Sequence, residues 1–160
     1  MLVIRAISPF APEARVLIDE LDRYQRSIYP EESNHLDSIH ELAKPNVCFL
    51  GAYLGGRLVG IGAVKYLSGD CKYGEIKRVY VKKSTRRKGV SRLLMKQLER
   101  NAQNRGISVL RLETGVHQPE AVGLYEKLGY IRCGRFGEYP DDPLSVFMEK
   151  QLEGGKGPDE

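Results

Sequence analysis

Residues 75–94, EIKRVYVKKSTRRKGVSRLL, decide the fold of this chain. The first seven residues have the β-rich pattern of a buried strand, and the rest is a basic turn with a glycine that opens a helix. Residues 82–92 contain six Lys or Arg side chains and no acid. Because the start of a helix carries a partial positive charge, an anion is favoured there and clustered cations are not. The stretch therefore predicts a binding site for a phosphate-bearing ligand.

The basic character of the chain is local to this turn. The 160 residues carry 25 Lys or Arg and 21 Asp or Glu, a net charge of +4, so the chain without these six basic residues is net acidic. A hydrophobic fraction of 41% and a charged fraction of 29% fit a globular protein, and no apolar run is long enough to span a bilayer. We therefore expect a cytoplasmic protein with no membrane partner.

Length and cysteine usage limit the organisation of the chain. One domain is predicted over residues 1–152, and the Gly-, Pro- and charge-rich residues 153–160 are predicted to be a disordered tail. Cys48, Cys71 and Cys133 are odd in number and lack paired spacing, which argues against a disulfide framework and a zinc site. Each cysteine is expected to be a small buried apolar residue.

Periodicity predicts the elements on both sides of the opening stretch. Alternating β-rich runs indicate strands, apolar residues at helical spacing indicate helices, and Gly55 and Gly56 form a hairpin turn. Leu93 and Leu94 are expected on the buried stripe of the third helix. Hairpins mixed with crossover helices predict an α/β layer architecture, in which helices cover a mixed sheet. The predicted strands are residues 2–7, 47–54, 58–67, 73–81, 107–114, 130–135 and 145–151, and the predicted helices begin at Pro12 or cover residues 36–42, 89–105 and 119–128.

Three ordered segments of the chain resemble one family. Arg86, Gly89 and Ser91 occupy the positions of an R/Q-x-x-G-x-G/A turn at the start of a helix. Upstream, EIKRVYV is similar to a strand that precedes this turn, and downstream, AVGLYEKLGY at residues 121–130 is similar to an A-x-x-LYxKxGF segment. The order and the intervals match those of the GNAT superfamily of acetyl-CoA-dependent N-acetyltransferases. The resemblance covers about half of the chain directly, and the predicted element order agrees over nearly all the rest.

The resemblance implies a fold, a co-substrate and a reaction. The fold is a GNAT-like mixed, mostly antiparallel sheet of about seven strands flanked by about four helices. The reaction moves the acetyl group of acetyl-CoA directly to a primary amine, without a metal ion. Homodimers are common in the family, so a homodimer is an open expectation.

The implied cofactor site lies along the fourth strand and the basic turn. In the family the pantetheine arm pairs with the strand backbone and the pyrophosphate binds at the helix start, where Gly89 permits a close approach of the backbone. Ser91 stands where Gly or Ala is usual, and Gln118 stands where the family often has Asn. The implied cofactor-binding residues are Val79, Tyr80, Val81, Arg86, Arg87, Lys88, Gly89, Val90, Ser91, Arg92 and Gln118.

Glu75 and Tyr125 are the implied catalytic residues. Glu75 lies at the offset from the turn where several members of the superfamily place a general base, and a base is needed because an alkyl ammonium must lose a proton before it attacks a thioester. Glu113 on the next strand, or water, is a rival base, and Glu75 has the alternative of pairing with Lys77. Tyr125 occupies the general-acid position, with core packing as its alternative.

The acceptor is not identified by the sequence. Tyr29, Glu32, Asn34 and His35, in a polar break of the chain, are the candidates for acceptor recognition. The acidic run at residues 136–145, FGEYPDDPLS, would favour a cationic amine if it lies at the mouth of the site. Small polyamines, amino acids, drugs, and protein N-termini or lysines all remain open.

Two other functions compete with this interpretation. One is a non-catalytic module that binds CoA as a sensor, although the presence of both Glu75 and Tyr125 argues against that. A nucleic-acid binder could use the basic residues 82–92, but one compact basic cluster without interleaved aromatic residues is weak support. We therefore expect an enzyme and no nucleic-acid partner.

Overall fold

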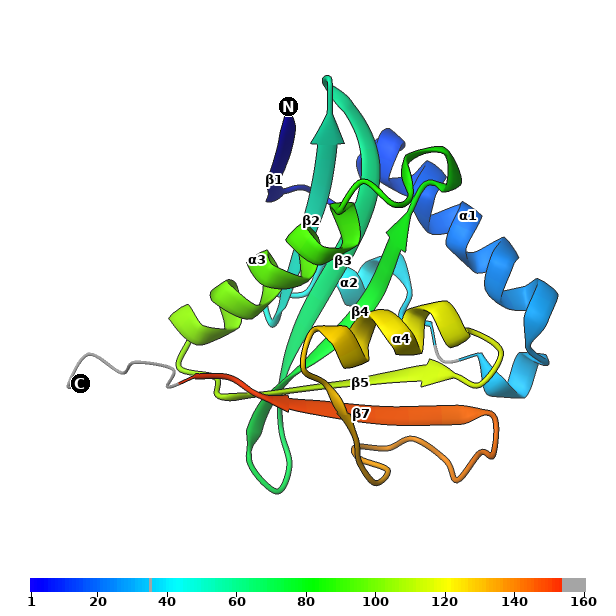
Figure 1. Cartoon of the computed structure of the whole chain (residues 1–160), viewed down its shortest axis with the longest axis vertical. Helices are drawn as coiled ribbons and strands as arrows, with labels where there is room; N and C mark the ends of the chain where they lie inside the picture. The colour runs from blue at the N-terminus through cyan, green and yellow to red at the C-terminus, as the bar shows by residue number, and fades with distance from the viewer. Residues whose placement is uncertain (35, 154–160) are drawn as a thin grey trace.

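The computed structural model describes residues 1–34 and 36–153, and in them a seven-stranded sheet is covered by helices on both faces (Figure 1). The order of elements is the predicted one. The strands are β1 (Leu2–Ala6), β2 (Val47–Leu54), β3 (Arg57–Ser68), β4 (Lys72–Val81), β5 (Val109–Gly115), β6 (Ile131–Arg132) and β7 (Ser145–Gln151). The helices are α1 (Pro12–Ile28), α2 (Ile39–Leu42), α3 (Val90–Asn104) and α4 (Pro119–Lys127), with 3-10 turns η1 (Glu31–Ser33) and η2 (Lys83–Thr85).

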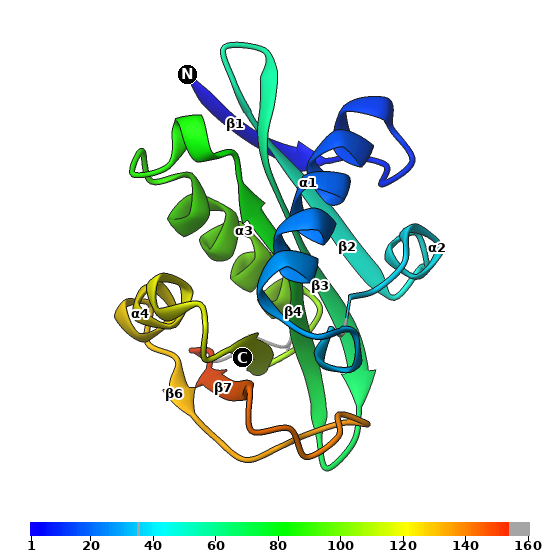
Figure 2. The same cartoon turned by 90° about the vertical axis from the view of Figure 1, so that its right-hand side faces the viewer.

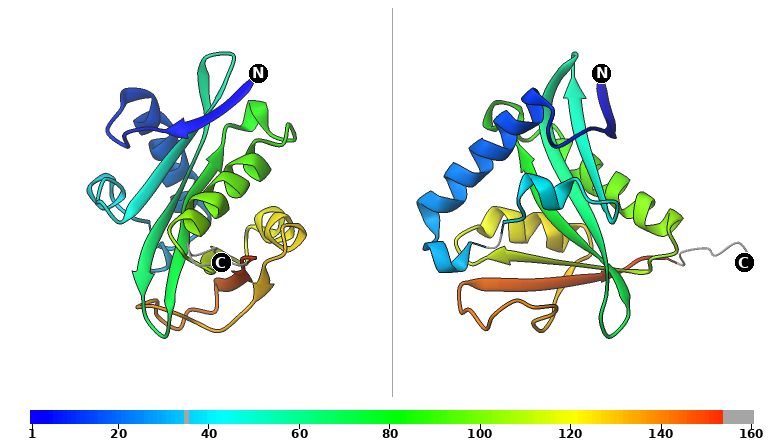
Figure 3. Two further views of the ribbon diagram at one scale, coloured as in Figure 1. Left: turned by 90° about the vertical axis from the view of Figure 1, so that its left-hand side faces the viewer. Right: turned by 180° about the vertical axis from the view of Figure 1, so that it is seen from behind.

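The sheet is mostly antiparallel, as predicted. Its strand order is β1-β2-β3-β4-β5-β7-β6, and the pairing of β4 with β5 is parallel. Helices α1 and α2 lie on one face and α3 and α4 on the other (Figures 2 and 3). Each face therefore has its own layer of buried side chains.

Strands β4 and β5 separate halfway along their length. Among the described residues their pairing comprises three positions, from Gly74 opposite Leu110 to Ile76 opposite Leu112. Strand β4 continues to pair with β3 as far as Val81, while β5 continues beside β7 (Figure 1). Beyond Ile76 the backbone of β4 therefore has an edge that β5 does not cover.

A β-bulge in β4 changes which residues face each side of the sheet. The register with β3 shifts between Ile61 and Ala63, and Arg78 has a left-handed φ of 59°. In a regular strand Val79 would lie on the same face as Lys77. In β4 the bulge changes this, so that Val79 packs on the α3 side of the sheet and Tyr80 packs on the α1 side. The bulge lies where β4 and β5 separate.

The α3 face holds the larger hydrophobic core. Helix α3 places Leu94, Met95 and Leu98 against the sheet, and all three are fully buried. Gly60 lets the helix come close, because a Cβ there would lie 3.1 Å from Leu94. Leu93, expected on the buried stripe, is instead 44% exposed. The side of α3 that faces the sheet lies between Leu94 and Met95. Leu93 therefore points away from the sheet.

Three further expectations differ from the structure. Strand β6 has two residues rather than six, because the chain leaves the sheet after Cys133, whose N–H donates to the Phe147 carbonyl at 2.9 Å. Cys71, in the β3–β4 turn, is exposed, and Cys48 and Cys133 are only partly buried, so none is the buried residue expected. Apart from Glu153, the predicted tail lies outside the described residues. No helix in the described ranges combines the length and apolarity needed to cross a membrane.

Candidate active site

A long groove runs along the uncovered edge of β4 and continues around the start of α3. Its first part, of about 640 Å³, lies between β4 and α4, and its second, of about 660 Å³, lies between the start of α3 and α4. The two parts share walls, including Val81, Arg86 and Ser91, and we call them together the groove. Ten of the eleven predicted cofactor residues line it. The exception is Lys88, which is exposed in the turn and belongs to neither wall.

The start of α3 is shaped for an anion. Gly89 precedes the first helical residue with a left-handed φ of 78°, and Arg87 has a φ of 68°. The first N–H groups of a helix have no partner within it, and here they lie at the wall of the groove. Arg86 is fixed at the end of β4, because its Nε donates to the Val81 carbonyl at 3.1 Å. The turn therefore combines open amides with basic side chains.

A second, smaller cavity lies where β4 and β5 separate, and we call it the acceptor cavity. Its volume is about 110 Å³, and its walls come from α1, β4, β5, α4 and the two segments around residues 33–37 and 139–145. The residues that it shares with the groove are Leu21, Val79, Gln118, Ala121 and Tyr125. The two spaces therefore meet beside Tyr125.

Tyr125 is a buried tyrosine at this meeting point. It is 8% exposed, and its ring contacts that of Tyr130 edge-on, with centroids 5.9 Å apart. Burial raises the pKa of Tyr125 to about 12. The hydroxyl therefore stays protonated at neutral pH and can donate a proton. The ring also packs in the core, so both interpretations of this residue fit its position.

Glu113 is one of two carboxylates in the wall of the acceptor cavity, and the other, Asp37, pairs with Lys65 and Lys77. Burial raises its pKa to about 7, although the Ser145 hydroxyl, which donates to Oε2 at 2.8 Å, and the nearby Lys77 favour the charged form. The neighbouring Glu75 and Asp142 add to the increase. A carboxylate with this pKa can accept a proton near neutral pH.

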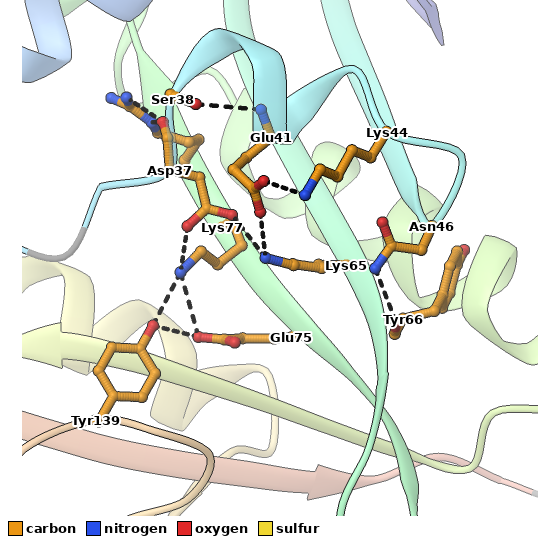
Figure 4. A network of polar contacts seen from close by, with 11 residues as sticks. Asp37, Ser38, Glu41, Lys44, Asn46, Lys65, Tyr66, Glu75, Lys77 and Tyr139 are labelled. Carbon is orange, nitrogen blue, oxygen red and sulfur yellow. Dashed lines mark hydrogen bonds and ion pairs between the residues drawn. The ribbon is translucent and has the colours of Figure 1, made fainter.

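Glu75 is buried behind the cavity and is not part of its wall. Its carboxylate accepts a hydrogen bond from the Tyr139 hydroxyl, and its Oε2 lies 3.5 Å from Lys77 Nζ (Figure 4). Lys77 also donates to the Tyr139 oxygen at 2.9 Å and pairs with Asp37 at 3.0 Å. Burial and the charge of Glu75 raise the pKa of Tyr139. The pairing of Glu75 with Lys77 is thus present, and its role as a base stays a prediction.

The predicted acceptor residues are only partly brought to the cavity. Tyr29 lines it, donates to Gln118 Oε1 at 3.2 Å and accepts from the His117 N–H at 3.1 Å. Burial raises the pKa of Tyr29. Asn34 is partly buried and Glu32 is exposed, and neither lines the cavity. His35 lies outside the described residues.

Known proteins resemble this chain over most of its length. Residues 15–130 match the profile of the family described as "Acetyltransferase (GNAT) family". The chain belongs to the GNAT acetyltransferase family. It is 45% identical over 145 residues to the "IAA acetyltransferase" of Azospirillum brasilense, covering 91% of this chain and 94% of that one. It is 39% identical over 125 residues to the Bacillus subtilis protein named "Uncharacterized N-acetyltransferase YsnE", covering 77% and 82%.

Solved structures agree with the fold. A Klebsiella pneumoniae protein assigned to the acyl-CoA N-acyltransferases is 38% identical, with a TM-score of 0.80 over 95% of this chain and 98% of that one. The PaiA N-acetyltransferase of Thermoplasma acidophilum, solved with coenzyme A, is 19% identical, with a TM-score of 0.70 over 95% and 99%. The sequence matches identify this GNAT chain as an acetyltransferase, and the distant structure supports its fold.

Several residues of this GNAT acceptor cavity were missed by the sequence analysis. The only available signal was alternation, which places Lys77 on the same face as Glu75. Nothing local marked Ser33 or Asp37, and Ser145 lies in the run at residues 136–145, of which only the acids were given a role. These three residues join Leu36, Arg78, Tyr139 and Leu144 in the wall of the cavity.

The acidic loop differs from its predicted role. Glu138 and Asp141 are exposed, and neither is part of the cavity wall. The carboxylate of Asp142 instead accepts a hydrogen bond from the Ser33 hydroxyl at 2.5 Å. The run reaches the cavity wall through Tyr139, Leu144 and Ser145 rather than through its acids, and a preference for a cationic amine stays a prediction.

Proposed function

We propose that this chain transfers the acetyl group of acetyl-CoA directly to a primary amine. The observation that carries the proposal is the meeting of the groove and the acceptor cavity beside Tyr125. Two reactants that enter from different spaces would be held together there, and such positioning accounts for much of the rate of two-substrate enzymes. Direct transfer needs no covalent enzyme intermediate and no metal ion.

The groove fits a CoA-type co-substrate. Residues 77–81 offer a strand edge that β5 does not cover, and the open amides at the start of α3 suit a pyrophosphate. Arg86, Arg87 and Arg92 line the same walls and would add charge-assisted hydrogen bonds. When bound, acetyl-CoA supplies an activated acetyl thioester. The remaining steps depend on residues of this chain.

We assign the general base to Glu113 in preference to Glu75. An ammonium with a pKa near about 10 must lose a proton before its nitrogen can attack, and the base must lie within reach of that nitrogen. Glu113 is in the cavity wall and has a pKa of about 7, whereas Glu75 is outside the wall and paired with Lys77. Glu75 acting through water is the remaining alternative.

Tyr125 and the β4 backbone would support the other half of the reaction. The protonated hydroxyl of Tyr125 lies where the two spaces meet, so it is the proposed acid for the departing thiolate. A backbone N–H near Val79, on the uncovered edge of β4, is the proposed donor to the developing oxyanion. The three free cysteines suit a reducing compartment, so a cytoplasmic location is part of the proposal.

A thiol-release assay tests this function. The purified protein is incubated with acetyl-CoA or a longer acyl-CoA and a panel of amines, and free CoA is measured. The proposal expects amine-dependent thiol release with acetyl-CoA. Tight CoA binding without release for any amine would instead support the non-catalytic module.

A further inference from the structure

The two loop segments that border the acceptor cavity are hydrogen-bonded to each other. Ser33, at the end of η1, donates to Asp142 Oδ2 at 2.5 Å across 109 residues of sequence. The other oxygen of that carboxylate accepts the Leu144 N–H at 2.9 Å, and the Asp142 carbonyl accepts the Ser145 N–H at 3.0 Å. The carboxylate is therefore held in place by its own loop before it meets Ser33.

A second set of contacts ties the same loop to the sheet. The Tyr139 hydroxyl contacts both Glu75 and Lys77, and Lys77 pairs with Asp37 on the segment that follows η1 (Figure 4). The Tyr139 ring packs edge-on between Phe136 and Phe147, with centroids 5.5 and 5.6 Å away. We call the Ser33–Asp142 and Tyr139–Lys77–Asp37 contacts together the clasp. It joins Ser33 and Asp37 to residues 139–142 and to β4.

The space behind the clasp is small and polar. At about 110 Å³ the acceptor cavity has roughly a sixth of the volume of the groove section beside β4, and it is well below the ~300 to 1,000 Å³ typical of sites for drug-sized ligands. Glu113, Gln118 and Ser145 contribute polar groups to its wall. The cavity suits an amine with few other heavy atoms.

We propose that this chain acetylates small polar primary amines, and that the clasp makes it discriminate against peptide and protein acceptors. This inference rests on the proposed acetyltransferase function and names its substrate class. Ser33, Asp37 and Tyr139 of the clasp line the cavity. The rest of a peptide that presents its N-terminus or a lysine to Glu113 would therefore contact the segments that the clasp joins. Hydrogen bonds between these segments oppose their separation, and specificity is the resulting difference in transition-state binding.

The test compares amines of different size in the same thiol-release assay. The small probes are glycine, ethanolamine and putrescine, and the large probes are a tetrapeptide with a free N-terminus and an N-acetylated tetrapeptide with one lysine. The wild-type protein should use at least one small amine with a kcat/KM at least 100-fold above that of either peptide. Equal or better use of a peptide overturns the inference while leaving the acetyltransferase function intact. The absence of thiol release with every probe contradicts both.

Variants show whether the clasp causes the discrimination. Ser33→Ala and the double variant Ser33→Ala/Tyr139→Phe should reduce the small-amine-to-peptide ratio, by at least tenfold in the double variant. Matched controls are Ser27→Ala, whose hydroxyl bonds only its own helix at the Tyr24 carbonyl, and Tyr66→Phe, which packs against the α3-side core. Both controls should leave the ratio within twofold. An unchanged ratio in Ser33→Ala with unchanged melting temperature overturns the role of the clasp, and this single variant decides if the double variant does not fold.

Discussion

The groove and the acceptor cavity are built in different ways from the same sheet. Half of the residues that line the groove come from one continuous stretch, residues 79–92, and this stretch offers backbone groups: an uncovered strand edge and the start of a helix. The acceptor cavity takes its walls from six separate segments and depends on how these segments pack together. A site made from local backbone can be recognised in a sequence. A site made from tertiary contacts cannot, and it is also the site where related proteins can differ.

The largest expected effect is on the groove. Gly89→Glu places a bulky anion at the start of α3 and forces a left-handed φ of 78° on a residue with a side chain. Loss of two or three charge-assisted contacts at about 1.5–3 kcal/mol each predicts an acetyl-CoA affinity at least about 10²-fold weaker. Calorimetry measures it. Gly134→Glu is the matched control, because Gly134 has open space around it and no positive φ. An unaltered acetyl-CoA affinity in Gly89→Glu would contradict pyrophosphate binding at the start of α3.

The next largest effect is on the pH dependence of the rate, which distinguishes the two candidate bases, Glu113 and Glu75. Because Glu113 must be deprotonated to act as a base, the wild-type rate should rise with pH through about 7 and then level off. Glu113→Gln should lower kcat by about 10²- to 10³-fold and abolish that rise. Glu75→Gln is the matched control and should keep the rise. If instead Glu75→Gln loses the rise and Glu113→Gln keeps it, the base is Glu75, acting through an intermediate group.

The sequence predicts the features that are encoded locally and misses those that depend on tertiary contacts. The hairpin of β2 and β3 is predicted to within one residue because Gly55 and Gly56 encode its turn locally. Strand β6 is predicted too long because its alternation continues toward Phe136, which leaves the sheet edge to pack on Tyr73. Arg78, at the bulge of β4, donates to the Asp37 carbonyl, and the sequence offers no periodic signal for that bulge.

Tyr125→Phe tests the point where the two regions meet. Without the hydroxyl, protonation of the leaving thiolate loses its proposed donor, and kcat should fall by about 10²-fold. Acetyl-CoA affinity should change less than twofold, because the ring that shapes both walls is retained. Steady-state kinetics and calorimetry on the same preparation measure the two quantities. Equal activity of the variant would leave Tyr125 as a packing residue and would place the acid elsewhere.

The smallest expected effect is on the free energy of unfolding, because a charged Glu113 buried in the acceptor cavity lowers stability. Burial raises the pKa of Glu113 from 4.5 to about 7, so the folded protein binds this proton more tightly than the unfolded chain does. The stability gained from this tighter proton binding by Glu113 is therefore fully present below about pH 4.5 and is lost as pH rises through about 7. At 1.36 kcal/mol per pKa unit, this difference corresponds to about 3 kcal/mol at pH 8.

Glu113→Gln, which cannot ionise, should therefore be more stable than the wild type at pH 8 by about 2–3 kcal/mol relative to their difference at pH 4. Denaturant unfolding at the two pH values measures this change. Glu120→Gln is the matched control, because Glu120 is exposed on the wall of the groove, and its stability should follow the wild type. If Glu113→Gln follows the wild type as well, Glu113 is solvated in the folded protein, and the acceptor cavity does not reduce stability through this residue.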